Sequence, residues 1–243
     1  MVLEAVLDSI KGDFSIKRIV SGLRFNAVLS RNCGIAASLH RDTPHLSAKF
    51  EFKSCSTMEL AKLSCSSDIE KASLGVAALN SLIKVDEARC SQDNASEIIK
   101  KHGRNKNVSI IGHFPFTEDL KPVAQNLWVM EKNKKPGDFS EEDAEKYLPL
   151  SHVVAISGTT LINHTIERLL ELCPAESVVL VLGGSSPLSP VLFDFGIDYI
   201  SGCRIMDAEA VFPLIAGGAT FREIKKSGKV RLLTMAREKI KGG

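Results

Sequence analysis

Short apolar runs separated by turn residues and helical stretches follow one another from residue 107 onward. Their apolar character is continuous rather than alternating, which is typical of strands covered on both faces by helices. A strand-helix alternation of this kind predicts a doubly wound α/β domain over residues 107–243, built on a parallel sheet of about six strands. The runs are NVSIIGHF, NLWVME, HVVAISG, SVVLVLG, DYISGCRI and KVRLLTM.

Residues 1–84 follow a different pattern. An amphipathic helix at 3–10 is followed by FSIKRIVSGLRFNAVLS and CGIAASLH, which predict two or three strands with no long helix between them, hence an antiparallel arrangement. Two helices come next, the second with Ser67 or Asp68 as its N-cap. We therefore expect a small α+β domain over 1–84 and a polar connecting segment with a short helix over 85–106.

The composition is that of an ordinary globular protein, with 44% hydrophobic and 25% charged residues and a formal net charge of +2. No strong field favours nucleic acid as a partner, and the apolar runs are shorter than the ~18 residues needed to span a membrane. Glu4 and Asp8 argue against a signal peptide, and the six cysteines lack C-x-x-C spacing. We expect a cytoplasmic protein with reduced thiols, and a homodimer as the default assembly.

In an open parallel sheet, ligands bind beyond the carboxyl ends of the strands. Three loops at such ends carry small or polar residues: GHFPF after the first predicted strand, SGTTLINHT after the third and GGSSPLSP after the fourth. In SGTTLINHT, Thr159 or Thr160 could cap the next helix, with Asn163 in its first turn. The exposed amides of that turn suit an anion, but capping alone explains the same residues equally well.

The GGSSPLSP loop is unusually stiff. Pro187 and Pro190 disfavour the helical conformation in the residues before them, so the next helix cannot begin before about Pro190, and Gly196 is placed to end it. The loop is neither a Walker motif nor a G-x-G-x-x-G motif. It therefore serves as a stiff connector and, at the carboxyl end of a strand, as a predicted pocket wall of another kind.

Candidate metal ligands are few. His113 could be a metal ligand, a general base or a structural residue, and Glu131, at the end of the neighbouring strand, could be its carboxylate partner or a surface residue. His40, Asp42 and His45 in LHRDTPH superficially resemble a metal cluster, but a solvated loop explains them better. Neither a Ser-His-Asp nor a Cys-His set follows from the spacing, so the residues alone do not decide whether the protein is an enzyme.

Several stretches, in a shared order that spans most of the chain, resemble the family described as "putative heavy-metal chelation", whose members carry an enolase N-terminal-like domain before a Rossmann-like domain. They are ASLGVAALNSLI, IIGHFPF, VMEKNKKPGDFSEEDAEKYLP, ISGTTLINHTIERLL and VLVLGGSSPLSPVLFDFGIDYISG. The resemblance implies these two domains and a ligand pocket in the cleft between them, for a heavy metal or a metal-containing small molecule. The cofactor is not identified by the sequence, and a transition metal is the candidate that the resemblance suggests.

The resemblance also implies the residues of the pocket. His113 and Glu131 are its candidate metal ligands. The alternative is an enzyme that holds a phosphorylated or nucleotide-like molecule in the same glycine- and serine-rich loops. The ligand-binding candidates are Asn80, Gly112, His113, Pro115, Thr159, Asn163, Thr165, Gly183, Ser185, Ser186 and Pro187.

Overall fold

The computed structural model describes residues 1–39 and 55–237. Within the first part of the chain, three strands form an antiparallel sheet in the order β1-β2-β3, as the sequence predicts. Helix α3 packs on this sheet and α2 packs against α3, whose N-terminus is capped by the side chain of Asp68. The elements are α1 (Val2–Ser9), β1 (Arg18–Ser21), β2 (Phe25–Leu29), β3 (Cys33–Ala37), α2 (Thr57–Lys62), the 3-10 helix η2 (Leu63–Cys65) and α3 (Ile69–Leu82).

The second sheet has seven strands in the order β4-β10-β9-β8-β7-β5-β6. Strands β5 to β9 pair in parallel, which confirms the α/β prediction. The runs of β5, β7 and β8 are buried at four of five positions, whereas β6 and β9 are partly exposed. The strands are β4 (Cys90–Ser91), β5 (Asn107–Ile111), β6 (Asn126–Met130), β7 (Val153–Ser157), β8 (Val178–Leu182), β9 (Tyr199–Ile205) and β10 (Val230–Ala236).

The last strand, β10, runs antiparallel to β9, unlike the parallel order expected for every run. The chain leaves β9 at its carboxyl end, and α8 then contacts β1 and β2 instead of crossing a face of the large sheet. Strand β10 therefore begins where β9 ended, with Val230 opposite Ile205. The predicted connecting segment adds β4, which pairs with β10 at Thr234 and Met235.

The remaining helices are short. The single helix expected after β7 is divided into α6 and α7 at His164, whose φ is +58°. The 3-10 helix η7 begins at Pro190 and stops before Gly196, whose φ is +82°, as the proline and glycine positions predict. The helices are α4 (Ala95–Gly103), η3 (Glu87–Arg89), η4 (Thr117–Leu120), η5 (Glu141–Asp143), α5 (Ala144–Tyr147), η6 (Leu148–Leu150), α6 (Thr159–Ile162), α7 (Ile166–Glu171), η7 (Pro190–Phe195), α8 (Ala208–Ala216) and α9 (Phe221–Lys226).

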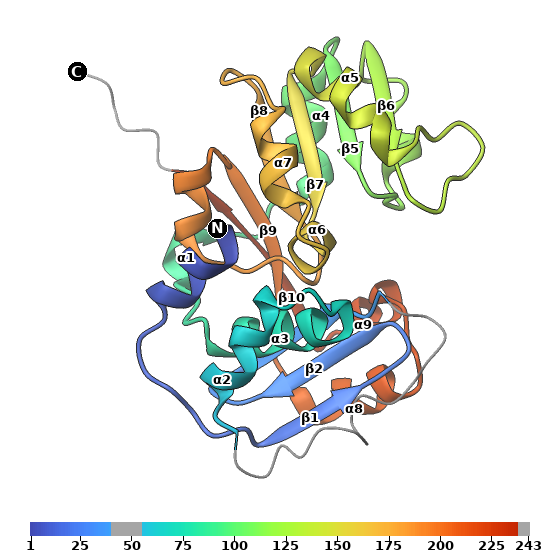
Figure 1. Ribbon diagram of the computed structural model, residues 1–243. Helices are drawn as coiled ribbons and strands as arrows, with labels where there is room; N and C mark the ends of the chain where they lie inside the picture. The colour runs from blue at the N-terminus through green and yellow to red at the C-terminus, as the bar shows by residue number, and fades with distance from the viewer. Residues whose placement is uncertain (40–54, 238–243) are drawn as a thin grey trace.

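Both parts of the chain contribute to a shared buried cluster. Val28 and Leu79 from the first part belong to the same buried cluster as Val154 and Ile200 from the large sheet. Figure 1 shows β1, β2, α2 and α3 gathered at the end of the large sheet where β7 leads into α6. The domain boundaries at residues 84 and 107 stay predictions. Across residues 1–39 and 55–237, no helix is long and apolar enough to cross a membrane.

Candidate functional site

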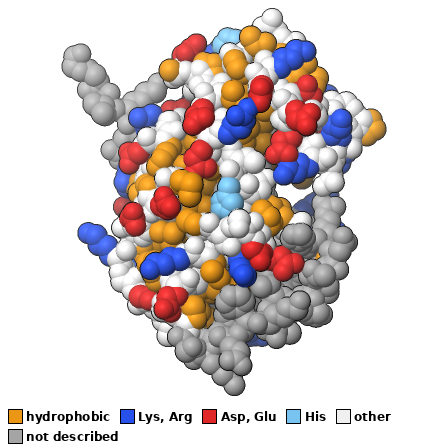
Figure 2. Space-filling view, in the orientation of Figure 1, with side chains coloured by type: hydrophobic (Ala, Val, Ile, Leu, Met, Phe, Trp, Pro, Cys, Tyr) orange, Lys and Arg blue, Asp and Glu red, His pale blue; other side chains and the backbone are white. Residues whose placement is uncertain are grey.

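A cleft of about 700 Å³ lies at the carboxyl ends of β5, β6 and β7. Its opposite side is formed by the ends of β2 and β3 and by the start of α9. Figure 2 shows the surface hollowed here. The lining residues are Leu23, Arg24, Phe25, Ala37, Ser38, Leu39, Ile69, Ile111, Gly112, His113, Phe114, Met130, Glu131, Lys132, Asn133, Glu141, Ser157, Thr159, Thr160, Asn163, Thr220 and Phe221.

The wall begins where β5 ends. Gly112 has a φ of +101°, a conformation that glycine adopts without strain, and a Cβ there would lie 3.0 Å from that of Ser157. Glu131 joins the ends of β5 and β6, because its Oε2 accepts from the backbone N–H of His113 at 3.0 Å. Its Oε1 accepts from the backbone N–H of Asn133 at 3.2 Å. Glu131 thus holds two loop backbones, and both of its oxygens are engaged.

The imidazole of His113 forms a pair with Asp138. Nδ1 of His113 lies 3.2 Å from Oδ2 of Asp138, and the two side chains are only 19% and 6% exposed. The same carboxylate oxygen accepts from the backbone N–H of Lys135 at 2.9 Å. A carboxylate at Nδ1 favours the tautomer that carries its proton there, which leaves Nε2 with a free lone pair. Nε2 has no partner within the described part of the chain, so His113 is equipped to bind a metal or accept a proton.

A complete metal shell is not assembled from the described residues. They contain no group of three or more His, Cys, Asp or Glu side chains that could hold an ion. His113 and Glu131 are neighbours as predicted, but their contact runs through the backbone N–H of His113. His40, Asp42 and His45 lie outside the described residues.

A thiolate ligand is also disfavoured near this site. Cys203 lies on β9 and Cys33 on β3. Burial raises the pKa of each thiol to about 12. Both therefore stay protonated near neutral pH, whereas a metal binds the deprotonated sulfur.

Hydroxyl groups line the cleft where β7 turns into α6. Oγ1 of Thr159 donates to Oγ of Ser157 at 2.9 Å, and Oγ1 of Thr160 donates to the backbone oxygen of Ser157 at 2.7 Å. Helix α6 follows Gly158 without a side-chain cap, so neither threonine plays the capping role considered above. Asn163 closes α6 instead of lying in its first turn, and its Oδ1 accepts from Oγ1 of Thr165 at 2.7 Å.

The glycine-rich loop supports the cleft from behind. Residues 183–187 do not line the cleft, and Ser185, Ser186 and Pro187 are buried. Oγ of Ser185 accepts from the backbone N–H of Ala37 at 2.8 Å, and Nδ2 of Asn80 donates to the backbone oxygen of Ser185 at 3.2 Å. These contacts join the loop after β8 to β3 and α3.

The loop also packs against two elements that do line the cleft. A Cβ on Gly184 would lie 2.9 Å from Cε2 of Phe221, and one on Gly158 would lie 2.5 Å from Oγ of Ser186. Only glycine therefore allows these approaches without a shift. Oγ of Ser186 and Oδ1 of Asn80 are buried and find no partner within residues 1–39 and 55–237.

The structure thus separates the predicted site residues into groups. Glu131 and four of the ligand-binding candidates line the cleft, whereas Thr165 lines a neighbouring hollow of about 470 Å³. Pro115 is exposed and outside both hollows. The four candidates in the cleft are Gly112, His113, Thr159 and Asn163, and those behind its wall are Asn80, Gly183, Ser185, Ser186 and Pro187.

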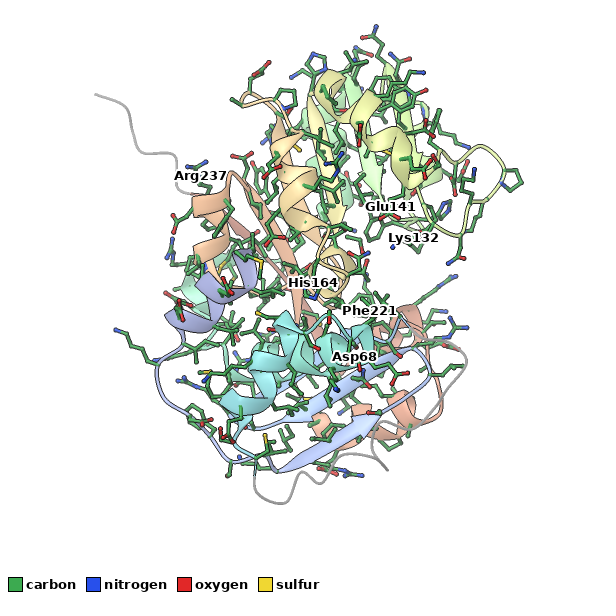
Figure 3. The ribbon with its side chains drawn as sticks, in the orientation of Figure 1. Asp68, Lys132, Glu141, His164, Phe221 and Arg237 are labelled. Carbon is green, nitrogen blue, oxygen red and sulfur yellow. The ribbon has the colours of Figure 1, made fainter. Side chains whose placement is uncertain are left out.

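Other residues that line the cleft could not be predicted from any motif or spacing in the sequence. Arg24, Phe25 and Phe221 come from segments far from the strand ends that the ligand rule selects. Lys132 and Glu141 form an ion pair at 3.4 Å and line both hollows, so they lie between them. Figure 3 shows Lys132 and Glu141 on one side of the gap and Phe221 on the other.

Comparisons with known proteins identify the family to which this architecture belongs. Two family models match, DUF4213 over residues 3–83 and DUF364 over residues 94–234, and both are described as "putative heavy-metal chelation". An uncharacterized protein of Methanocaldococcus jannaschii is 27% identical over 158 residues, which are 62% of this chain and 61% of that protein, so the match spans less than two thirds of the relative.

Two crystal structures of DUF364 proteins of unknown function share the fold. The one from Desulfitobacterium hafniense has a TM-score of 0.87 and 24% identity, covering 97% of this chain and 98% of its own. The one from Pyrococcus horikoshii has a TM-score of 0.85 and 19% identity, covering 98% of this chain and 100% of its own. With its family model matched over residues 94–234, this chain belongs to the DUF364 family, described as "putative heavy-metal chelation".

Proposed function

We propose that the protein binds a metal-containing small molecule in the cleft, namely a metal ion already held by an organic chelator. Nε2 of His113 would take one coordination position of that metal. The observation that carries this proposal is the His113–Asp138 pair in the cleft wall, which leaves Nε2 as a lone-pair donor.

The donor set favours a chelated ion over a bare one. A bare transition metal needs four or more protein or water ligands, and the described residues offer no group of three. Both oxygens of Glu131 accept hydrogen bonds from backbone N–H groups, which makes them less available as a second metal ligand. A chelator that brings most of the ligands needs only one or two from the protein.

The size of the cleft supports the same choice. Its volume of about 700 Å³ lies within the ~300–1,000 Å³ of typical small-molecule sites. If the domain boundaries at 84 and 107 hold, this is an interdomain cleft. All six cysteines are free, which fits a reducing compartment such as the cytoplasm.

The proposal is tested by calorimetric titration of the untagged protein with the Ni²⁺–nitrilotriacetate complex, which leaves two coordination positions open. We expect His113→Ala to weaken binding at least tenfold, and Asp138→Asn to weaken it by about 10- to 100-fold because the ring loses its orienting partner. His152→Ala is the matched control, because His152 is exposed and lies outside the cleft. Equal affinities of the wild type and His113→Ala would contradict the proposal.

The second candidate is an enzyme acting on a phosphorylated or nucleotide-like molecule. It is favoured by Arg24, whose positive charge lies near the Glu223 carboxylate and which lines the cleft together with Thr159 and Thr160. A thermal-shift screen with nucleotides, sugar phosphates and pyridoxal phosphate tests it, because a ligand that binds the native state raises the melting temperature. Stabilisation by these phosphates, lost in Arg24→Ala, would favour the second candidate.

A further inference from the structure

Two kinds of group line the cleft, polar and apolar, and both of its walls carry each kind. Hydroxyl, amide and imidazole groups lie along the turn from β7 into α6 and at the end of β5. The other lining residues include three phenylalanines together with Ile69 and Met130. The phenylalanines are Phe25, Phe114 and Phe221, and they come from β2, the loop after β5 and the start of α9.

The ring of Phe221 is held in place from several directions. Its centroid lies 6.0 Å from that of Phe25, with the planes inclined at 41°. Oγ1 of Thr220 accepts from the backbone N–H of Glu223, whose carboxylate accepts from the backbone N–H of Thr220, and this capping box fixes the first turn of α9. Gly184 leaves room for the ring at its back. Phe221 is nevertheless only half-buried, so part of its surface is available in the cleft.

Phe114 is supported in a similar way. Its ring stacks on that of Phe116, with centroids 5.3 Å apart and planes inclined at only 11°. Like Phe221, Phe114 is half-buried and lines the cleft. Aromatic rings whose backs are packed and whose other surfaces border a cavity suit a flat ligand, because ring-on-ring contacts need little rearrangement.

We propose that the ligand of this cleft is a chelator with a planar aromatic body, which lies against Phe221 and Phe114 while its metal is near His113. This inference rests on the proposed function, because it assigns the chemistry of the molecule that carries the metal. The rings recognise the chelator and His113 recognises the metal. The two contributions are therefore separable by experiment.

The test compares two Ni²⁺ complexes of 1:1 composition, with pyridine-2,6-dicarboxylate and with iminodiacetate. Both chelators supply one nitrogen and two carboxylates, but only the first is a flat aromatic ring. Calorimetric titration of the untagged protein gives the affinity for each. We expect the aromatic complex to bind about three- to tenfold more tightly, the range that an aromatic contact supplies.

Variants assign that preference to the rings. Phe221→Leu and Phe114→Leu keep an apolar side chain and should bring the affinity ratio of the two complexes close to one. Phe195→Leu is the control, because Phe195 is half-buried in η7 and does not line the cleft, and it should leave the ratio unchanged. Melting temperatures of all variants verify that they are folded.

The outcomes separate the two proposals. Equal wild-type affinities for the two complexes, or a preference that survives in both Phe221→Leu and Phe114→Leu, would overturn the aromatic chelator while leaving the metal site intact. If neither complex binds in a way that depends on His113, the proposed function itself fails, and this inference fails with it.

Discussion

Gly158 lies where β7 turns into α6, and a side chain there would collide with the glycine-rich loop. An ideal Cβ would lie 2.5 Å from Oγ of Ser186, 2.8 Å from its backbone nitrogen and 3.1 Å from the carbonyl carbon of Ser185. The φ of Gly158 is −59°, which any residue adopts, so the cost of Gly158→Ala is steric rather than conformational. The substitution must therefore move the loop and α6 apart.

The size of the effect follows from the kind of contact. Overpacking of a closely packed interior costs about 1–3 kcal/mol. In a chain of 243 residues, each kcal/mol lowers the melting temperature by about 2–4 °C. We therefore expect Gly158→Ala to melt about 2–12 °C below the wild type. Because Thr159 and Thr160 follow directly, the shift should also weaken binding in the cleft.

A double-mutant cycle measured by urea unfolding isolates the contact. Ser186→Ala removes the oxygen that the new methyl group meets but keeps the backbone nitrogen, so it should relieve part of the penalty and give a coupling of about 0.5 kcal/mol or more. Gly228→Ala is the control, since a Cβ there meets nothing within 4 Å, and its cost should add to that of Ser186→Ala. A melting temperature of Gly158→Ala within about 1 °C of the wild type would refute the reasoning.

Three further predictions concern other parts of the fold. Burial raises the pKa of Cys33, Cys173 and Cys203 to about 12. In the native state these thiols should therefore react slowly with Ellman's reagent at pH 8. A native-state reaction as fast as that of the protein unfolded in urea would contradict this. Above about pH 9 the unfolded chain releases protons that the folded chain keeps. Urea unfolding should therefore show stability falling with rising pH by roughly 1.4 kcal/mol per thiol per pH unit. Asp68→Ala removes the carboxylate that accepts from the backbone N–H groups of Glu70 and Lys71. It should lower the free energy of unfolding in urea by about 1 kcal/mol. An unchanged urea midpoint would contradict this expectation.

The apolar runs predicted the strands of the large sheet well, because a strand buried on both faces must be apolar at every position. Val178–Leu182 is an example, with four of its five residues buried. The same pattern carries no information on strand direction, and β10 shows the consequence. Its direction depends on α8 packing against β1 and β2, which is a tertiary contact that residues 208–216 do not encode locally.

The sequence predicted only those site residues whose position follows from the strands of the large sheet. The carboxyl-end rule selected His113, Thr159 and Asn163, all of which line the cleft. It could not find Asp138, whose pairing with His113 depends on how a polar loop folds back after β6. Nor could it find Phe25, which comes from the other sheet, because no spacing along the chain encodes how the two sheets meet.

The glycine-rich loop explains why a motif can identify a place without identifying a contact. Glycine is needed where the backbone approaches another group closely, whether that group is a ligand or another part of the protein. Here Gly184 approaches Phe221 and the loop's Ser186 approaches Gly158, while Ser185 accepts a hydrogen bond from Ala37. The loop thus fixes how the Phe221 side of the cleft lies relative to the side formed by the turn from β7 into α6. A ligand that contacts only those sides would still depend on the glycines behind them.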